Sequence, residues 1–274
     1  MGAVAARGTA GVTAQDWEAF HRRWSRLRPP LRASPDVVEA LRHAIEDHSS
    51  EVLLLGVTPE LAELGSRMVA LDWSQTMIDH IWPGDSPTRQ AMLADWRSMP
   101  FDTPRFSAVI GDGSFNCLFG ADVATVFGEL FRVLAPGARL AVRVYVTPSP
   151  CERLEAVQKD VMSGAPGGFH GFKWRLAMAL AAESGSAEVA VADVFNCFEA
   201  LFPDRNVLAH ATGWSHETIA EIDAYKGSEA VYLFPTHAQV LASVPAGFLN
   251  ARFVSSGAYD LAERCPILVA DFEP

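Results

Sequence analysis

The sequence is poor in cysteine and in long apolar segments. Its four cysteines form no CxxC pair, and their wide spacing fits neither a disulfide scaffold nor a zinc site. No apolar run approaches the roughly 20 residues that a membrane-spanning helix needs, and the first residues show no secretory or twin-arginine signal. We therefore expect a cytoplasmic protein with free thiols, no bound metal and no membrane partner.

Positive charge is also scarce, except near the N-terminus. The formal net charge is −11, but residues 1–34 hold six arginines against two acids, which gives +4 and leaves −15 for the rest. Because an acidic surface repels phosphate backbones, we expect no nucleic-acid partner. Lysine occurs only as Lys159, Lys173 and Lys226.

A glycine-rich phosphate-binding motif is the third absence. Neither GxGxxG nor GxxxxGK[ST] occurs in the sequence, which argues against NAD, FAD and ATP as ligands. An NAD-type oxidoreductase stays open as an alternative, and it would require dinucleotide binding without the glycine fingerprint.

Short apolar runs alternate with helical patterns over the first two thirds of the chain. The expected strands are residues 51–56, 68–72, 89–95, 106–112 and 139–146, the expected helices 35–45, 75–81 and 122–134, and two closing strands 249–257 and 265–272. This alternation predicts a Rossmann-like, doubly wound α/β sheet.

Two further regions surround this α/β domain, which we place at residues 49–147 and 249–274. Residues 148–248 read mainly as helix and form a candidate substrate-binding insertion. Residues 1–48 contain N-terminal helices, one of them with an apolar stripe that includes Trp17, Trp24 and Leu27. This helix either packs on the core with a solvated arginine face or forms a lid over a ligand.

In a doubly wound sheet, ligands bind beyond the carboxyl ends of the strands. Strand one ends at Gly56, where Thr58 would cap a helix whose free N–H groups favour a carboxylate. Strand two ends at Asp72, 16 residues after Gly56, which suits either a ribose diol or a helix N-cap.

The next two strand ends also carry acids. Asp95 and Trp96 suit the amino edge and the face of an adenine, and the alternative is a turn aspartate beside a core tryptophan. Asp112 lies between Gly111 and Gly113, which permit close backbone approach. Four successive strand ends therefore carry residues suited to one ligand.

The order of these residues resembles the class I S-adenosylmethionine-dependent methyltransferase family. The matching segments are VLLLGVTPEL, VALDWSQTMI, MLADWRSMPF, IGDGSFNCL and LFRVLAPGARLAVRVYV, with the closing strands in ARFVSSGAYDLAERCPILVADF. The resemblance implies a seven-stranded sheet in the order 3-2-1-4-5-7-6 with strand seven antiparallel, and S-adenosylmethionine as the cofactor.

The resemblance also implies roles for the candidate cofactor-binding residues at the strand ends. Gly56, Val57 and Thr58 would line the methionine part, with Asp72 on the ribose hydroxyls and Trp73 and Met77 beside it. Asp95 and Trp96 would contact the adenine, and Asp112, Gly113 and Ser114 would lie beside the sulfonium. Trp24 is a candidate on a separate ground: if the N-terminal helix forms a lid, Trp24 would close over the cofactor.

The chain departs from the family after strand one, where most members have E/D-x-G-x-G-x-G and this sequence has glycine only at Gly56. The first hypothesis is methyl transfer to a small-molecule acceptor by in-line displacement, which positioning alone can drive. The alternative is a non-catalytic protein that keeps the fold as a cofactor sensor or partner-binding module. The sequence identifies no catalytic residue: His170, His210, His216 and His237 are candidate bases, but a lone histidine is more often structural.

Overall fold

The computed structural model describes residue 21 and residues 23–164 and 167–274. Half of the helix predicted at residues 16–27, including Trp17, lies outside these residues. Its described end is a short 3-10 turn, η1, at Trp24–Arg26.

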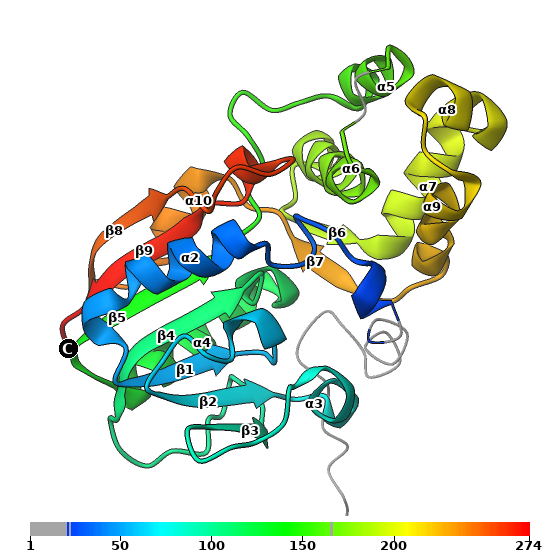
Figure 1. The fold of residues 1–274 in the computed structure, drawn as a ribbon. Coiled ribbons are helices and arrows are strands. Elements are labelled where there is room, and N and C mark those ends of the chain that lie inside the picture. Colours follow the sequence, from blue (N-terminus) through cyan, green and yellow to red (C-terminus); the bar gives the residue numbers. More distant parts are fainter. Residues whose placement is uncertain (1–20, 22, 165–166) are drawn as a thin grey trace, which may run out of the picture.

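A seven-stranded sheet forms the centre of the protein (Figure 1). Its order is β3-β2-β1-β4-β5-β9-β8, and β9 runs antiparallel to both of its neighbours. Because β8 and β9 are the sixth and seventh strands of this sheet along the chain, the predicted order 3-2-1-4-5-7-6 is confirmed. The strands are β1 (Glu51–Leu55), β2 (Arg67–Asp72), β3 (Arg89–Leu93), β4 (Phe106–Asp112), β5 (Leu134–Arg143), β8 (Phe248–Val254) and β9 (Ile267–Phe272).

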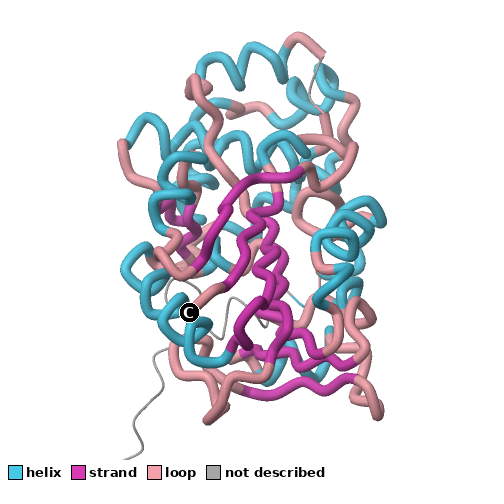
Figure 2. Tube along the Cα trace, turned by 90° about the vertical axis from the view of Figure 1, so that its left-hand side faces the viewer, coloured by secondary structure: helices cyan, strands magenta, loops and turns pink. Residues whose placement is uncertain are grey.

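The middle residues of the central strands are apolar because helices cover both faces of the sheet (Figure 2). Leu53 and Leu55 of β1 pack in one core cluster, and Val52 and Leu54 pack in another on the opposite face. Helices α4 (Gly120–Val133) and α10 (His237–Ser243) contribute to the first cluster, and α2 (Pro35–Ala44) and α3 (Gln75–Ile81) contribute to the second.

Helix starts follow the sequence signals at two places and depart from them at a third. The Ser34 and Ser74 side chains cap α2 and α3, as hydroxyls at the N-cap position do. The helix expected after Thr58 is wrong: Pro59–Leu61 forms only a 3-10 turn, η3, and the Thr58 side chain caps nothing. Leu61 and other apolar residues of this short connection turn into the core, so burial decides its conformation.

The region between β5 and β8 is mainly helical, as predicted, and has a core of its own. Its elements are α5 (Leu154–Met162), α6 (Phe169–Ser184), β6 (Glu188–Ala190), α7 (Val191–Leu201), α8 (Arg205–Thr212), α9 (His216–Ala220), η5 (Glu221–Tyr225), β7 (Val231–Leu233) and α10. The antiparallel β6–β7 pair and helices α8 and α10 were not predicted. Figure 1 shows α6, α7 and the β6–β7 pair beyond the carboxyl ends of the parallel strands.

Cys117, Cys151, Cys197 and Cys265 are free thiols in the structure. Within residues 23–164 and 167–274, no helix combines the length and apolar character required to cross a bilayer.

Candidate functional site

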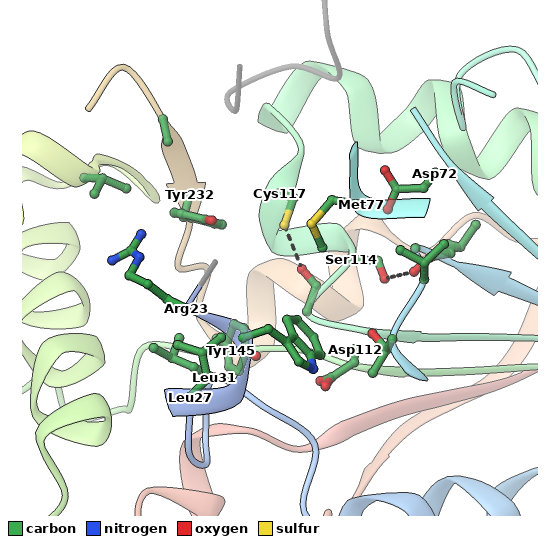
Figure 3. A pocket seen from close by; sticks show the side chains of 18 of the residues that line it. Arg23, Leu27, Leu31, Asp72, Met77, Asp112, Ser114, Cys117, Tyr145 and Tyr232 are labelled. Atoms are coloured by element: carbon green, nitrogen blue, oxygen red, sulfur yellow. Dashed lines mark hydrogen bonds between the residues drawn. The ribbon is translucent and has the colours of Figure 1, made fainter. Parts of the chain in front are cut away.

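A cavity lies where the parallel strands end, between the sheet, the segment before α2 and the helical region (Figure 3). The volume of the cavity that the centre of a water molecule can occupy is about 140 Å³. Most of the predicted cofactor-binding residues line it: Trp24, Gly56, Val57, Thr58, Asp72, Trp73, Met77, Trp96, Asp112, Gly113 and Ser114. The fold therefore brings together every predicted residue except Asp95, and their roles remain predictions.

The ends of β1 and β4 are held together by a side-chain hydrogen bond. The Ser114 hydroxyl donates to the carbonyl oxygen of Leu55 at 2.7 Å. A Cβ at Gly111 would lie 2.4 Å from Ser114 Oγ, so only glycine fits there. Gly56 turns the chain out of β1 with φ of +102°, a conformation that L side chains rarely adopt.

Asp72 is a buried carboxyl group at the end of β2. Its Oδ1 accepts the backbone N–H of Ser74 at 2.8 Å, and the residue is only 4% exposed. Burial raises the pKa of Asp72 to about 7, although the backbone hydrogen bonds from Ser74 and Trp73 oppose the shift. The N-cap interpretation of Asp72 is wrong, because Ser74 caps α3 and leaves the aspartate facing the cavity.

The end of β3 separates the two residues that were predicted to contact an adenine. Trp96 lines the cavity, and its indole N–H donates to the buried carbonyl oxygen of Leu71 at 2.7 Å. Asp95 lies outside the cavity lining and forms an ion pair with Arg97, with Nη2 and Oδ2 2.7 Å apart. Burial would raise the pKa of Asp95, but the hydrogen bonds from Arg97 hold it below its ordinary value. Asp95 thus has a partner already, and the geometry does not direct it to an adenine.

Asp112 is held by Arg143, which the sequence analysis missed. Arg143 Nε lies 2.5 Å from Asp112 Oδ1, and neither side chain is more than 4% exposed. The guanidinium also donates to the Tyr259 hydroxyl at 2.9 Å and to the Pro30 carbonyl oxygen at 2.7 Å. Burial lowers the pKa of Arg143, but Asp112 raises it well above the ordinary value, so the arginine stays charged. A charged residue within the apolar segment AVRVYV is the signal that could have identified it.

Asn116 connects the loop after β4 to two other elements. Its amide donates to the carbonyl oxygens of Tyr145 at 2.9 Å and Leu233 at 2.6 Å, and its Oδ1 accepts the Tyr145 N–H at 3.0 Å. The Tyr145 ring lies so close to Gly113 that a Cβ there would meet it at 2.6 Å. Asn116 therefore fixes the sheet side of the cavity against the strand pair of the helical region.

The segment before α2 covers part of the cavity. Trp24, Leu27 and Leu31 line it, and Arg32 stacks over the Trp24 ring at 5.6 Å while pairing with Glu60 of η3. Of the two tryptophans of the predicted lid, Trp24 lies among the described residues and lines the cavity, and Trp17 lies outside them.

The helical region supplies the other side of the cavity, with Lys173, Trp174, Tyr225 and Tyr232 among its lining residues. Figure 3 shows Tyr232 and Arg23 on one side of the cavity and Asp72 and Met77 on the other. Lys173 was not predicted as a site residue, whereas the three aromatic residues were expected either in the helix core or in an apolar acceptor pocket.

The structure does not favour the candidate bases. His170, His210, His216 and His237 do not line the cavity. Burial, together with the charge of Lys173, lowers the pKa of His170 to about 4. Cys117 lines the cavity, but burial raises the pKa of its thiol to about 12, so it is not a nucleophile at neutral pH.

Comparisons with known proteins agree with this architecture. Residues 56–142 match the family model described as a methyltransferase domain. No curated protein sequence matches the chain. A structure of Burkholderia thailandensis 1,6-didemethyltoxoflavin-N1-methyltransferase, with bound 1,6-didemethyltoxoflavin and S-adenosylhomocysteine, is 12% identical at a TM-score of 0.50, covering 100% of this chain and 99% of that one. A Methanosarcina mazei S-adenosylmethionine-dependent methyltransferase is 12% identical at a TM-score of 0.50, covering 88% and 99% of the two chains.

A third similar structure bears a different description. It is a Rhodobacter sphaeroides protein with a provisional description as a Zn-dependent alcohol dehydrogenase, 12% identical at a TM-score of 0.55, covering 95% of this chain and 98% of that one. At this identity the likeness shows the fold alone. In the described part of this chain, no group of three or more His, Cys, Asp and Glu residues could hold a metal ion. The matched domain over residues 56–142 and the strand order are those of a Rossmann-like methyltransferase fold.

Proposed function

We propose that the protein binds S-adenosylmethionine in the sheet side of the cavity and transfers its methyl group to a small molecule in the other side. The observation that carries the proposal is the convergence of four strand ends on one cavity, with a buried carboxyl group at the second of them.

The residues on the sheet side fit the cofactor. Asp72 offers carboxylate oxygens to a ribose diol, and Trp96 has a fixed indole beside it for the adenine. Gly56 alone adopts a positive φ in the turn after β1, while Thr58 keeps an ordinary φ of −56°. The turn therefore forms without the missing glycines, and a cofactor without phosphates does not need their close backbone approach.

When bound, S-adenosylmethionine supplies an electrophilic methyl group. The chain's part is to orient the acceptor and exclude water, which can lower the barrier by on the order of 7–11 kcal/mol at best. Trp24 and Leu27 cover the cavity, and Asp112 and Gly113 form its floor at the end of β4. No side chain is assigned as a general base.

The alternative is a non-catalytic sensor, which the bulky Val57-Thr58-Pro59 turn favours. The extension of the cavity beyond the predicted cofactor residues, to Lys173 and Tyr232, favours an enzyme because it leaves space for an acceptor.

Calorimetric titration with S-adenosylmethionine and S-adenosylhomocysteine tests the proposal. We expect micromolar binding that Asp72→Asn weakens at least tenfold and Asp79→Asn, an exposed change on the same helix α3, leaves unaltered. Absence of binding at millimolar concentration would overturn it, and dinucleotide binding instead would favour the oxidoreductase. Tight binding without methyl transfer to any acceptor in a broad metabolite screen would favour the sensor.

A further inference from the structure

Lys173 is a buried cation on the acceptor side of the cavity. It lies on α6 between the buried residues Phe172 and Trp174 and is 2% exposed. It lines the cavity with Trp174, Tyr225 and Tyr232. Its Nζ lies 4.8 Å from the ring centroid of Tyr225. In residues 23–164 and 167–274, no hydrogen-bond acceptor and no carboxylate within 4.0 Å partners this ammonium group.

The charges around Lys173 do not neutralise it. Glu221 attracts it from η5 without a close contact and lies 3.5 Å from His170 instead, whereas Arg23 repels it from the N-terminal segment. Burial lowers the pKa of Lys173 to about 7. A buried ammonium without a hydrogen-bonded partner is costly, so a ligand anion at this place would be bound strongly.

The walls around Lys173 suit a flat molecule. Trp174 packs edge-on against Tyr145, with ring centroids 5.6 Å apart, and at a tilt against Tyr232, also at 5.6 Å. The Trp174 indole N–H is buried and has no acceptor among the described residues, so the same wall holds a second unused donor.

We propose that the acceptor is a planar, apolar molecule with an anionic oxygen, a carboxylate or a phenolate, and that Lys173 Nζ pairs with this oxygen. This inference rests on the proposed function, since it specifies the acceptor for the same cavity. A cationic acceptor would meet both Lys173 and Arg23. The acids of the cavity lie on the sheet side, where Asp112 is already paired with Arg143.

The test uses three probes with one ring system: 2-naphthoate, 2-naphthamide and 2-naphthylmethylammonium. Calorimetry at pH 7, with and without S-adenosylhomocysteine, should show the acid binding at least tenfold more tightly than the amide. Lys173→Met should abolish this preference, Lys173→Arg should retain it, and Lys159→Met, an exposed change on α5, should not alter it. Thermal unfolding checks that each variant is folded.

Two further measurements test whether the acceptor oxygen is a phenolate or a carboxylate, and whether binding depends on the proton of Lys173. Binding of 4-nitrophenol as its phenolate, seen in the absorption spectrum and lost in Lys173→Met, would assign a phenolic acceptor, and preference for the carboxylate alone would assign an acid. Affinity for the bound anion should fall as the pH rises through about 7, because Lys173 loses its proton, while affinity for the amide stays constant.

The inference is overturned by equal affinity for acid and amide, by no binding of the acid, or by tightest binding of the ammonium probe. Failure of S-adenosylhomocysteine to bind, with the acid preference intact, would overturn the proposed function alone.

Discussion

Lowering the pH from 8 to 6 should weaken cofactor binding by protonating Asp72. If the ribose hydroxyls donate to the carboxylate, only the ionised form binds well. With a pKa of about 7, roughly 90% of Asp72 is ionised at pH 8 and roughly 10% at pH 6. The dissociation constant for S-adenosylhomocysteine should therefore rise about ninefold between these two pH values.

Calorimetry in two buffers measures this linkage directly. At pH 7 binding should release about half a proton per site, because Asp72 is half protonated before binding and ionised after it. The observed enthalpy should accordingly be more exothermic in Tris, which takes up the proton with a large release of heat, than in phosphate. Asp72→Asn should bind more weakly, with no pH dependence from this site. Lys173→Met should keep the pH dependence of the wild type.

Protonation of Asp72 also affects the free energy of unfolding. The folded pKa of Asp72 lies above its unfolded value of 3.8, so the free energy of unfolding falls as the pH rises from about 4 to about 7. The shift corresponds to at most about 4 kcal/mol at neutral pH.

A dissociation constant that is flat from pH 6 to 8, with no proton released, would refute the assignment of the ribose to Asp72.

Other variants test the framework of the cavity. Arg143→Met should cost about 3–5 kcal/mol in urea unfolding because it leaves Asp112 buried without its counterion, and adding Asp112→Asn should recover part of the loss. Gly113→Ala should cost about 1–3 kcal/mol in urea unfolding and weaken cofactor binding, whereas Gly137→Ala, also at positive φ but in open space, should cost about 1 kcal/mol and leave binding intact. Asn116→Ala should cost about 2–3 kcal/mol and, by calorimetry, weaken naphthoate more than S-adenosylhomocysteine. Equal costs for the two glycines, or no cost for Arg143→Met, would contradict these contacts.

The sheet could be predicted because its signals are local. Runs such as residues 52–55 are apolar throughout because both faces of the sheet are covered, and the strand ends of one sheet meet at one edge. That rule is enough to bring Asp72 and Asp112 to the same cavity from their positions in the sequence. It fails for Asp95, because an arginine two residues later supplies a partner that strand position does not reveal.

The acceptor side was harder to predict because its contacts are distant in sequence. Asn116 reaches Leu233, and Arg143 reaches Pro30 and Tyr259, and no local pattern specifies such pairs. Strands β6 and β7 have three residues each, too few to show alternation. The aromatic residues of the helical region are typical of a pocket in general terms, but the sequence distinguishes Lys173 only by the rarity of lysine.

The hydrogen bond from Arg143 to Pro30 has a kinetic consequence. It ties the covering segment to the sheet at one end, through a guanidinium that is fully buried. If the segment opens while this hydrogen bond holds, Pro30 stays in place and Trp24 and Leu27, which line the cavity, move. Trp24 and Leu27 border the cavity that the cofactor side and the acceptor side share. Movement of this segment would therefore govern both the entry of the acceptor and the release of the demethylated cofactor. Turnover would then follow the rate at which the segment opens.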